Sequence, residues 1–252
     1  MMKKLHFISC IILPALVSII IGLQFNRLAA GLNSGMSSNY TEWQDEFNLS
    51  QRQLSDEGKS TYFILIPGFQ TILEHKSTRL IITVLNQTKV VCGVTTRVVE
   101  ERELKNGELY EISRNFYAID TETGDAFYFG EEVDYYKDGE VINHEGAWMA
   151  DESDNRPGMI MPGNPQTGMK YYQELAPGVA MDRAKVISTN KTFTTPLGEF
   201  TNCLETEESS KIKTLLFFNP TETKIYAPEI GLIKDESLRL IGYGYLSFTE
   251  EK

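Results

Sequence analysis

The chain has 252 residues, of which 41% are hydrophobic and 23% are charged. A chain of this length and composition can bury a full core, which excludes collagen-like, low-complexity and wholly disordered proteins. Its formal net charge is −11, the reverse of the basic surface that nucleic-acid binders present, so we expect no nucleic-acid partner.

The first thirty residues have the form of an export signal. Lys3 and Lys4 precede a mostly apolar run from Leu5 to Leu23, and this order of a cationic and an apolar region is what the secretion machinery reads. Cleavage near Ala29-Ala30-Gly31 would release the mature chain, whereas an uncleaved run would anchor it in the membrane. We predict a signal helix at 1–30 and an exported protein, either periplasmic or extracellular, that touches the membrane only if the apolar run is kept.

Residues 31–59 are polar and rich in Ser, Asn, Gln and Glu, which is typical of a linker. Within them, Thr41-Glu42-Trp43-Gln44 has the form of a capping box. At most, a short amphipathic helix would dock here on the following domain, with Trp43, Phe47 and Leu54 on one face.

From residue 60 to residue 252 we predict a single all-β domain. Short runs of alternating character are separated by turns, and Asn106-Gly107 is the strongest hairpin signal, followed by Asp138-Gly139. Alternating β–α segments are absent, so we expect an antiparallel meander that forms a curved half-barrel, a barrel or a sandwich. The predicted strands are Thr61–Ile66, Phe69–His75, Arg79–Leu85, Val94–Glu103, Leu109–Ile119, Ala126–Phe129, Val133–Lys137, Val141–His144, Tyr171–Leu175, Val179–Ile187, Glu199–Thr206, Leu215–Phe218, Lys224–Ala227 and Leu238–Phe248.

Two cysteines remain once the signal has been removed with Cys10. Cys92 and Cys203 both lie in β-like apolar segments. In an oxidising compartment they either pair as a disulfide or stay as buried thiols, and the sequence leaves both alternatives open. No CxxC motif is present, so neither redox catalysis nor a zinc ribbon is indicated.

The acidity of the chain is concentrated between Asp120 and Asp154. Twelve carboxylates lie there against one lysine, so this segment alone accounts for the whole net charge. The first interpretation is a solvated acidic surface that keeps an exported protein soluble, and a cationic protein partner is another. A calcium site is a further alternative, with Asp151 and Asp154 as oxygen ligands.

A carboxylate pair for acid–base chemistry is the remaining hypothesis for this segment. Glycoside hydrolysis needs two carboxylates on either side of a sugar. The hairpin at Asp138-Gly139 could bring Glu131 or Glu132 towards Glu145, and Asp151 is the other candidate partner. These residues define the alternative of a glycosidase-like hydrolase.

Signatures of the common enzyme classes are absent from the sequence. His6, His75 and His144 are the only histidines, and there is no HExxH helix, GxSxG elbow or glycine-rich phosphate loop. The sequence therefore leans towards a protein that is not an enzyme, without deciding the question.

Several short motifs follow one another along the chain, and their order indicates a protein family more specifically than any single motif does. The motifs are Tyr128-Phe129-Gly130-Glu131-Glu132, Gly146-Ala147-Trp148-Met149-Ala150, Pro157-Gly158-Met159-Ile160-Met161-Pro162, Tyr171-Tyr172-Gln173-Glu174, Pro177-Gly178 and Ala180-Met181-Asp182-Arg183-Ala184. Over roughly Phe63 to Ile233 the chain resembles a widespread family of exported, uncharacterised bacterial proteins. The resemblance implies an exported bacterial domain and carries no assigned activity. This chain departs from the family at Asp151–Arg156, where a short Asp-Gly-Ala stretch is usual.

Trp148, Met161 and Tyr171 are the candidate ligand-binding residues. Such side chains either pack in the core or line an apolar mouth that suits a lipid or another hydrophobic molecule. The leading hypothesis is an exported, non-catalytic β domain that binds a hydrophobic ligand or an envelope protein. We expect no cofactor, with calcium as the alternative.

Overall fold

The computed structural model describes residues 40–150, 152–211 and 221–246. The predicted signal, the strand expected at 215–218 and the candidate residue Asp151 lie outside these ranges. Within the same ranges, no helix combines the length and apolar character needed to cross a membrane.

Nearly all regular structure in the described residues is β, as the sequence predicts. A single turn of 3-10 helix, η1, covers Leu49–Gln51. The strands are β1 (Leu54–Ser55), β2 (Gly58–Lys59), β3 (Ile64–Leu65), β4 (Phe69–His75), β5 (Thr78–Val91), β6 (Val94–Lys105), β7 (Glu108–Asp120), β8 (Ala126–Lys137), β9 (Glu140–Asn143), β10 (Trp148–Met149), β11 (Arg156–Met161), β12 (Lys170–Tyr172), β13 (Glu174–Leu175), β14 (Asp182–Thr195), β15 (Gly198–Ser210), β16 (Glu222–Ala227), β17 (Gly231–Asp235) and β18 (Leu238–Tyr245).

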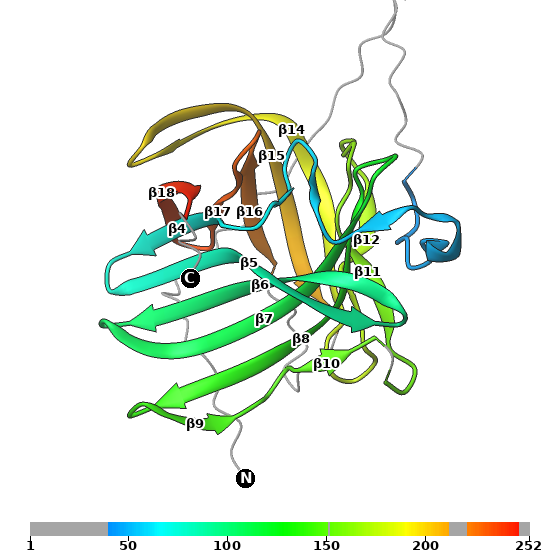
Figure 1. Cartoon of the computed structure of the whole chain (residues 1–252). Helices are drawn as coiled ribbons and strands as arrows, with labels where there is room; N and C mark the ends of the chain where they lie inside the picture. Colours follow the sequence, from blue (N-terminus) through cyan, green and yellow to red (C-terminus); the bar gives the residue numbers. More distant parts are fainter. Residues whose placement is uncertain (1–39, 151, 212–220, 247–252) are drawn as a thin grey trace, which may run out of the picture. The chain divides into compact units, whose positions relative to one another are not determined.

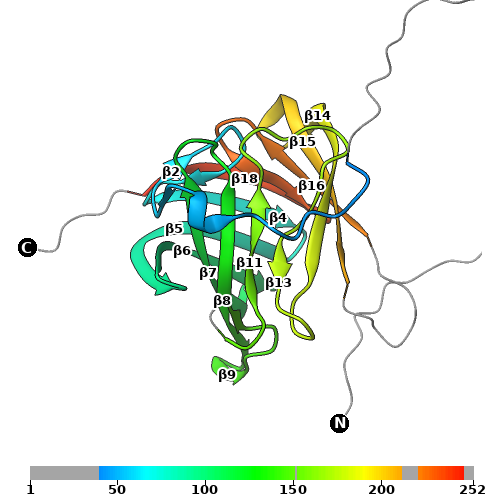
Figure 2. The same cartoon turned by 90° about the vertical axis from the view of Figure 1, so that its right-hand side faces the viewer.

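In the described residues, sixteen of these strands form one antiparallel sheet, with the order β12-β14-β15-β16-β17-β18-β4-β5-β6-β7-β8-β11-β13. Strands β1, β9 and β10 join it at β7 and β8, while β2 and β3 pair separately. Figures 1 and 2 show β4 to β8 as one curved wall and β14 to β16 as the wall that faces it. The sheet thus curls almost into a barrel, which confirms the predicted all-β meander.

One short segment brings the two ends of the sheet together. In Lys170–Leu175, the first half pairs with β14 and the second half pairs with β11. Between the halves, the backbone N–H of Gln173 donates to the carbonyl of Asp182 over 2.8 Å. Because one continuous stretch bonds to both end strands, this closing segment holds the barrel nearly shut.

The two expected hairpins form where glycine follows Asn or Asp. Asn106 and Gly107 have φ values of 55° and 83°, and Asp138 and Gly139 have values of 55° and 82°. Two successive residues with positive φ are what a tight type I′ turn requires, and its twist matches that of the flanking strands. These turns join β6 to β7 and β8 to β9.

The core of the described part of the chain consists of two clusters. The larger one is centred on β7 and β8 and includes Phe116, Phe127 and Phe129, while the smaller one is built around Leu73 and Leu240. Cys203 belongs to the smaller cluster as a buried free thiol, so it does not pair with Cys92, which is exposed.

Residues 40–59 differ from the linker and short α-helix expected there. The Gln44 backbone exchanges hydrogen bonds with β12, through the carbonyl of Lys170 (3.0 Å) and the N–H of Tyr172 (2.9 Å). Phe47 is buried against the ring of Phe127, and β1 pairs with β7. The described part of this segment therefore belongs to the domain, because its backbone groups bond to strand edges rather than to a local helix.

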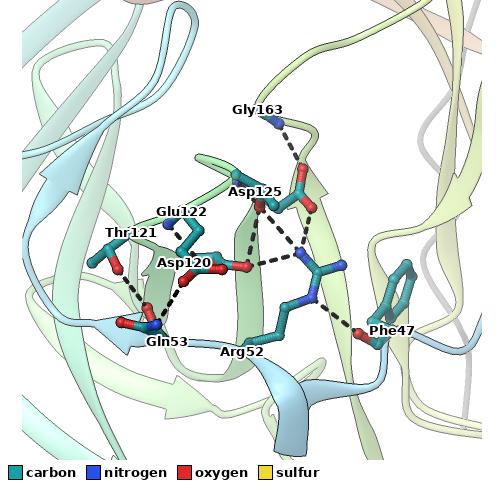
Figure 3. A network of polar contacts seen from close by, with 9 residues as sticks. Phe47, Arg52, Gln53, Asp120, Thr121, Glu122, Asp125 and Gly163 are labelled. Carbon is teal, nitrogen blue, oxygen red and sulfur yellow. Dashed lines mark hydrogen bonds and ion pairs between the residues drawn. The ribbon is translucent and has the colours of Figure 1, made fainter.

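An ion-pair network fixes this segment to the barrel (Figure 3). Arg52 Nη1 lies 2.9 Å from Asp120 Oδ2 and 2.7 Å from Asp125 Oδ2. Arg52 Nε donates to the carbonyl of Phe47, and Asp125 Oδ1 accepts the N–H of Gly163. Burial acts to raise the pKa of Asp120, but Arg52 and nearby hydrogen-bond donors outweigh it and hold that pKa below its ordinary value.

We expect Arg52→Ala to lower the free energy of unfolding by about 3 kcal/mol, because it leaves buried carboxylates without their cation. Urea unfolding followed by circular dichroism measures this loss. The control is Arg79→Ala, which breaks the exposed pair with Glu74 and should cost less than about 1 kcal/mol. Equal losses in the two variants would show that Arg52 is no more than a surface charge.

Candidate functional site

A cavity of about 310 Å³ lies inside the barrel and is partly open to solvent. Its lining comes from β3 to β8, β11 and β13 to β17, so strands all around the barrel contribute. Along β7, the lining residues are Glu111, Ser113, Asn115 and Tyr117. This spacing of two shows that every second side chain of the strand points inwards.

One part of the cavity wall is aromatic. The ring of Tyr117 lies 5.4 Å from that of Phe63 and 4.8 Å from that of Tyr128, centroid to centroid. All three residues line the cavity, and Trp148 packs on Tyr128 at 5.3 Å. Phe63 is positioned by the turn before β3, where its carbonyl accepts the N–H of Ser60. The aromatic rings thus offer an apolar surface to a bound molecule.

Another part of the wall is acidic. Six carboxylates line the cavity, and Lys224 is the only cation among the lining residues that the structure describes. Lys224 Nζ lies 3.3 Å from Glu208 Oε2 and 3.8 Å from Asp235 Oδ2, so Lys224 forms ion pairs with these two carboxylates. The other lining carboxylates, which have no ion-pair partner among the described residues, are Glu101, Glu111, Glu131, Glu174 and Asp182.

The carboxyl groups of the cavity have raised pKa values. Burial raises the pKa of Glu101 to about 7, against the opposing effect of the Lys224 charge, and raises that of Glu131 to about 8. Neighbouring carboxylates add to both shifts. Burial and the charges of Asp182 and Glu131 raise the pKa of Glu174 as well. The cavity therefore takes up protons at a pH where exposed carboxyl groups are fully ionised.

Polar side chains complete the lining of the cavity. Tyr117 is 6% exposed and Gln173 is 4% exposed, and both line the cavity. In the described residues, the buried side-chain atoms without a hydrogen-bond partner are Ser60 Oγ, Trp148 Nε1 and the Tyr171 hydroxyl, and none of these residues lines the cavity. The Tyr128 hydroxyl, which does line it, donates to Asn115 Oδ1. The lining thus presents hydrogen-bonding side chains to a molecule inside the cavity.

The structure separates the carboxylates proposed as a catalytic pair. Glu131 lines the cavity, whereas the adjacent Glu132 is exposed on the opposite face of β8, 2.5 Å from Lys89. Glu145 is exposed in the loop before β10 and does not line the cavity. Of the carboxylates proposed for acid–base work that the structure describes, Glu131 alone reaches the interior.

The three residues proposed to bind a hydrophobic ligand are buried in the larger core cluster. Trp148, Met161 and Tyr171 are 3%, 1% and 1% exposed. None of them lines the cavity, although Trp148 supports its aromatic wall from behind. Their role in binding stays a prediction.

Calcium binding also stays a prediction. Asp154 lies in the turn before β11 and its proposed partner, Asp151, is outside the described residues. Across residues 40–150, 152–211 and 221–246, no group of three or more His, Cys, Asp or Glu side chains is arranged to hold a metal ion.

Most of the polar lining could not be identified from the sequence, because Glu101, Glu174 and Lys224 come from strands far apart in the chain. The signal that pointed to them is the two-residue alternation, but this period does not say which face turns inwards.

Comparisons of the chain with protein families, with curated proteins and with solved structures find no match. The fold and the site together define a nearly closed antiparallel β-barrel with an internal cavity that is aromatic in one part and acidic in another.

Proposed function

We propose that this domain is an exported, non-catalytic binding protein that encloses a small organic molecule inside its barrel. The observation that carries the proposal is the cavity itself, a space of about 310 Å³ inside the barrel that is lined by aromatic rings in one part and by carboxylates in another. A small molecule with an apolar part and a polar group would match this lining.

The cavity also fits the apolar part of such a ligand. Its volume of about 310 Å³ is at the lower end of the range for small-molecule sites, roughly 300–1,000 Å³. The rings of Phe63, Tyr117 and Tyr128 form a continuous apolar surface on one side. This arrangement supports the hydrophobic ligand expected from the sequence, with the addition that its other end is polar.

The hydrolase remains the alternative, and one observation favours it. Glu131 reaches the cavity with a pKa raised to about 8, which would let it donate a proton at neutral pH. Release of sugar from a panel of glycans by the wild-type protein, abolished in Glu131→Gln, would support this alternative over simple binding.

The binding proposal is tested by filling the cavity. Val99 lines the cavity from β6, so we expect Val99→Trp to weaken binding of the neutral dye N-phenyl-1-naphthylamine at least tenfold in a fluorescence titration. Val90 is 63% exposed on β5, so Val90→Trp adds the same side chain outside the barrel and should leave the affinity unchanged. Dye binding that is equal in both variants, or absent from the wild type, would contradict the proposal.

A further inference from the structure

We infer that the ligand is an amphipathic organic cation, with an ammonium group held among Glu101, Glu131 and Glu174 and an apolar part laid against the aromatic wall. This inference rests on the proposed function and adds the chemical class of the ligand.

The first step is the way the strands bring the carboxylates together. Glu101 on β6 pairs in register with Ser113, and Glu131 on β8 pairs with Asn115. Ser113 and Asn115 are consecutive inward-facing positions of β7. Glu101 and Glu131 therefore lie on either side of β7, about 7 Å apart along the direction of that strand. Glu174 belongs to the closing segment and also lines the cavity, and the charge of Glu131 contributes to raising its pKa.

The second step is the charge balance of this acidic region. Lys224 is engaged by Glu208 and by Asp235, which does not line the cavity. The charge of Lys224 acts to lower the pKa of Glu101 and of Glu174, but among the described residues Glu101, Glu131 and Glu174 form no ion pair. The charge of Glu101 acts on Glu131 and that of Glu131 acts on Glu174, so these neighbours repel one another. A cation supplied from outside would remove this repulsion and allow all three to ionise.

The third step is the position of the aromatic wall. The inward positions of β7 run from Glu111 through Ser113 and Asn115 to Tyr117, which is about 20 Å at roughly 3.3–3.4 Å per residue. The lining along this strand changes from carboxylate to amide to aromatic ring. Aromatic faces attract ammonium groups as well as apolar chains, and the neighbouring Tyr117 and Tyr128 rings are suited to both. An elongated molecule with a charged head and an apolar tail matches this order.

The test uses three probes that share an eight-carbon chain: octyltrimethylammonium, 1-octanol and octanoate. At pH 8.5 we expect the ammonium probe to bind the purified protein at least tenfold more tightly than octanol, and octanoate to bind most weakly, in calorimetric titrations. The double variant Glu131→Gln/Glu174→Gln should reduce the preference for ammonium over octanol at least tenfold, while octanol binding stays within twofold of the wild type. The control is Glu132→Gln/Glu140→Gln, which makes the same change in net charge at two exposed positions and should keep the preference.

The pH dependence gives a second measurement, since a quaternary ammonium group does not titrate. Affinity for octyltrimethylammonium should rise between pH 6 and pH 9 as the cavity carboxyl groups lose their protons. The groups that face Glu131 are Tyr128 on β8, Glu101 on β6, Glu111 on β7, Glu174 on β13 and Asp182 on β14, and the charge of Lys224 on β16 acts on Glu101 and Glu174. Tyr128 stays neutral in this range because burial raises its pKa.

The outcomes separate the inference from the proposed function. If octanol and the ammonium probe bound equally well and both lost affinity in Val99→Trp, the inference that the ligand is a cation would be wrong. The cavity would then bind neutral molecules, as the proposed function requires. If calcium displaced the ammonium probe at an equal or lower concentration, the inferred organic cation would be wrong and the site would bind a metal ion instead. Absence of binding for all three probes and for the neutral dye would overturn both.

Discussion

Gly158→Ala is expected to prevent the barrel from closing and to lower the free energy of unfolding by about 4 kcal/mol or more, a loss in the range of severe steric substitutions. A Cβ atom at this position would lie 2.1 Å from the carbonyl oxygen of Gln173, 2.4 Å from its carbonyl carbon and 2.9 Å from the backbone nitrogen of Glu174. These are backbone atoms of the closing segment, so they cannot rotate away as a side chain would. β11 and the closing segment would have to separate, and the sheet would lose the contact that joins its ends.

The matched control for this substitution is Gly242→Ala in β18. Its nearest neighbour would be the Ile72 Cδ1 atom at 3.9 Å, which is ordinary van der Waals contact. Urea unfolding of both variants, together with binding of the neutral dye, measures the difference. If Gly158→Ala matched the wild type in stability and in dye binding, the closing segment would not be what holds the cavity together.

Glu131→Gln is expected to make the domain more stable than the wild type at high pH, by about 1–2 kcal/mol once solvent in the cavity is allowed for. The pKa of Glu131 is raised from an ordinary value of 4.5 to about 8 in the folded protein. Between these two values the folded state binds a proton that the unfolded state has lost, so stability falls as the pH rises. Below pH 4.5 both states are protonated, and the substitution should have little effect.

Thermal unfolding between pH 4 and pH 9 measures this prediction. The wild type should lose stability across the window, with Glu101 contributing in the same direction because its pKa is about 7. The curve of Glu131→Gln should be flatter. Glu132→Gln is the control, because that carboxylate is exposed on the other face of the same strand, and its curve should follow the wild type. Parallel curves for all three proteins would show that Glu131 is ionised at little cost and that the cavity is well solvated.

Much of the fold could be predicted because it depends on local rules. The turn residues Asn106-Gly107 and Asp138-Gly139 determine their own backbone conformation, and the alternation of side chains indicates strands without reference to the rest of the chain. The segment around Gln44 and Phe47 could not be predicted in this way, because its backbone groups bond to strands far along the sequence.

The site was harder to predict, as Glu131 and Glu132 illustrate. Alternation requires that adjacent residues of a strand point to opposite faces, so one of the two had to face the interior. Only the curvature of the sheet decided that Glu131 does so. The same curvature placed Glu101, Glu174 and Tyr117 around one space although they lie on three different strands.

The sequence by itself determined the all-β class and the positions of the main hairpins, since turn chemistry and the period of side-chain alternation are properties of short stretches of chain. Only the tertiary structure decided the existence of the cavity and the identity of its lining. The physical reason is that closing a sheet into a barrel selects one face of every strand as the inside, and this selection depends on pairing between its distant ends.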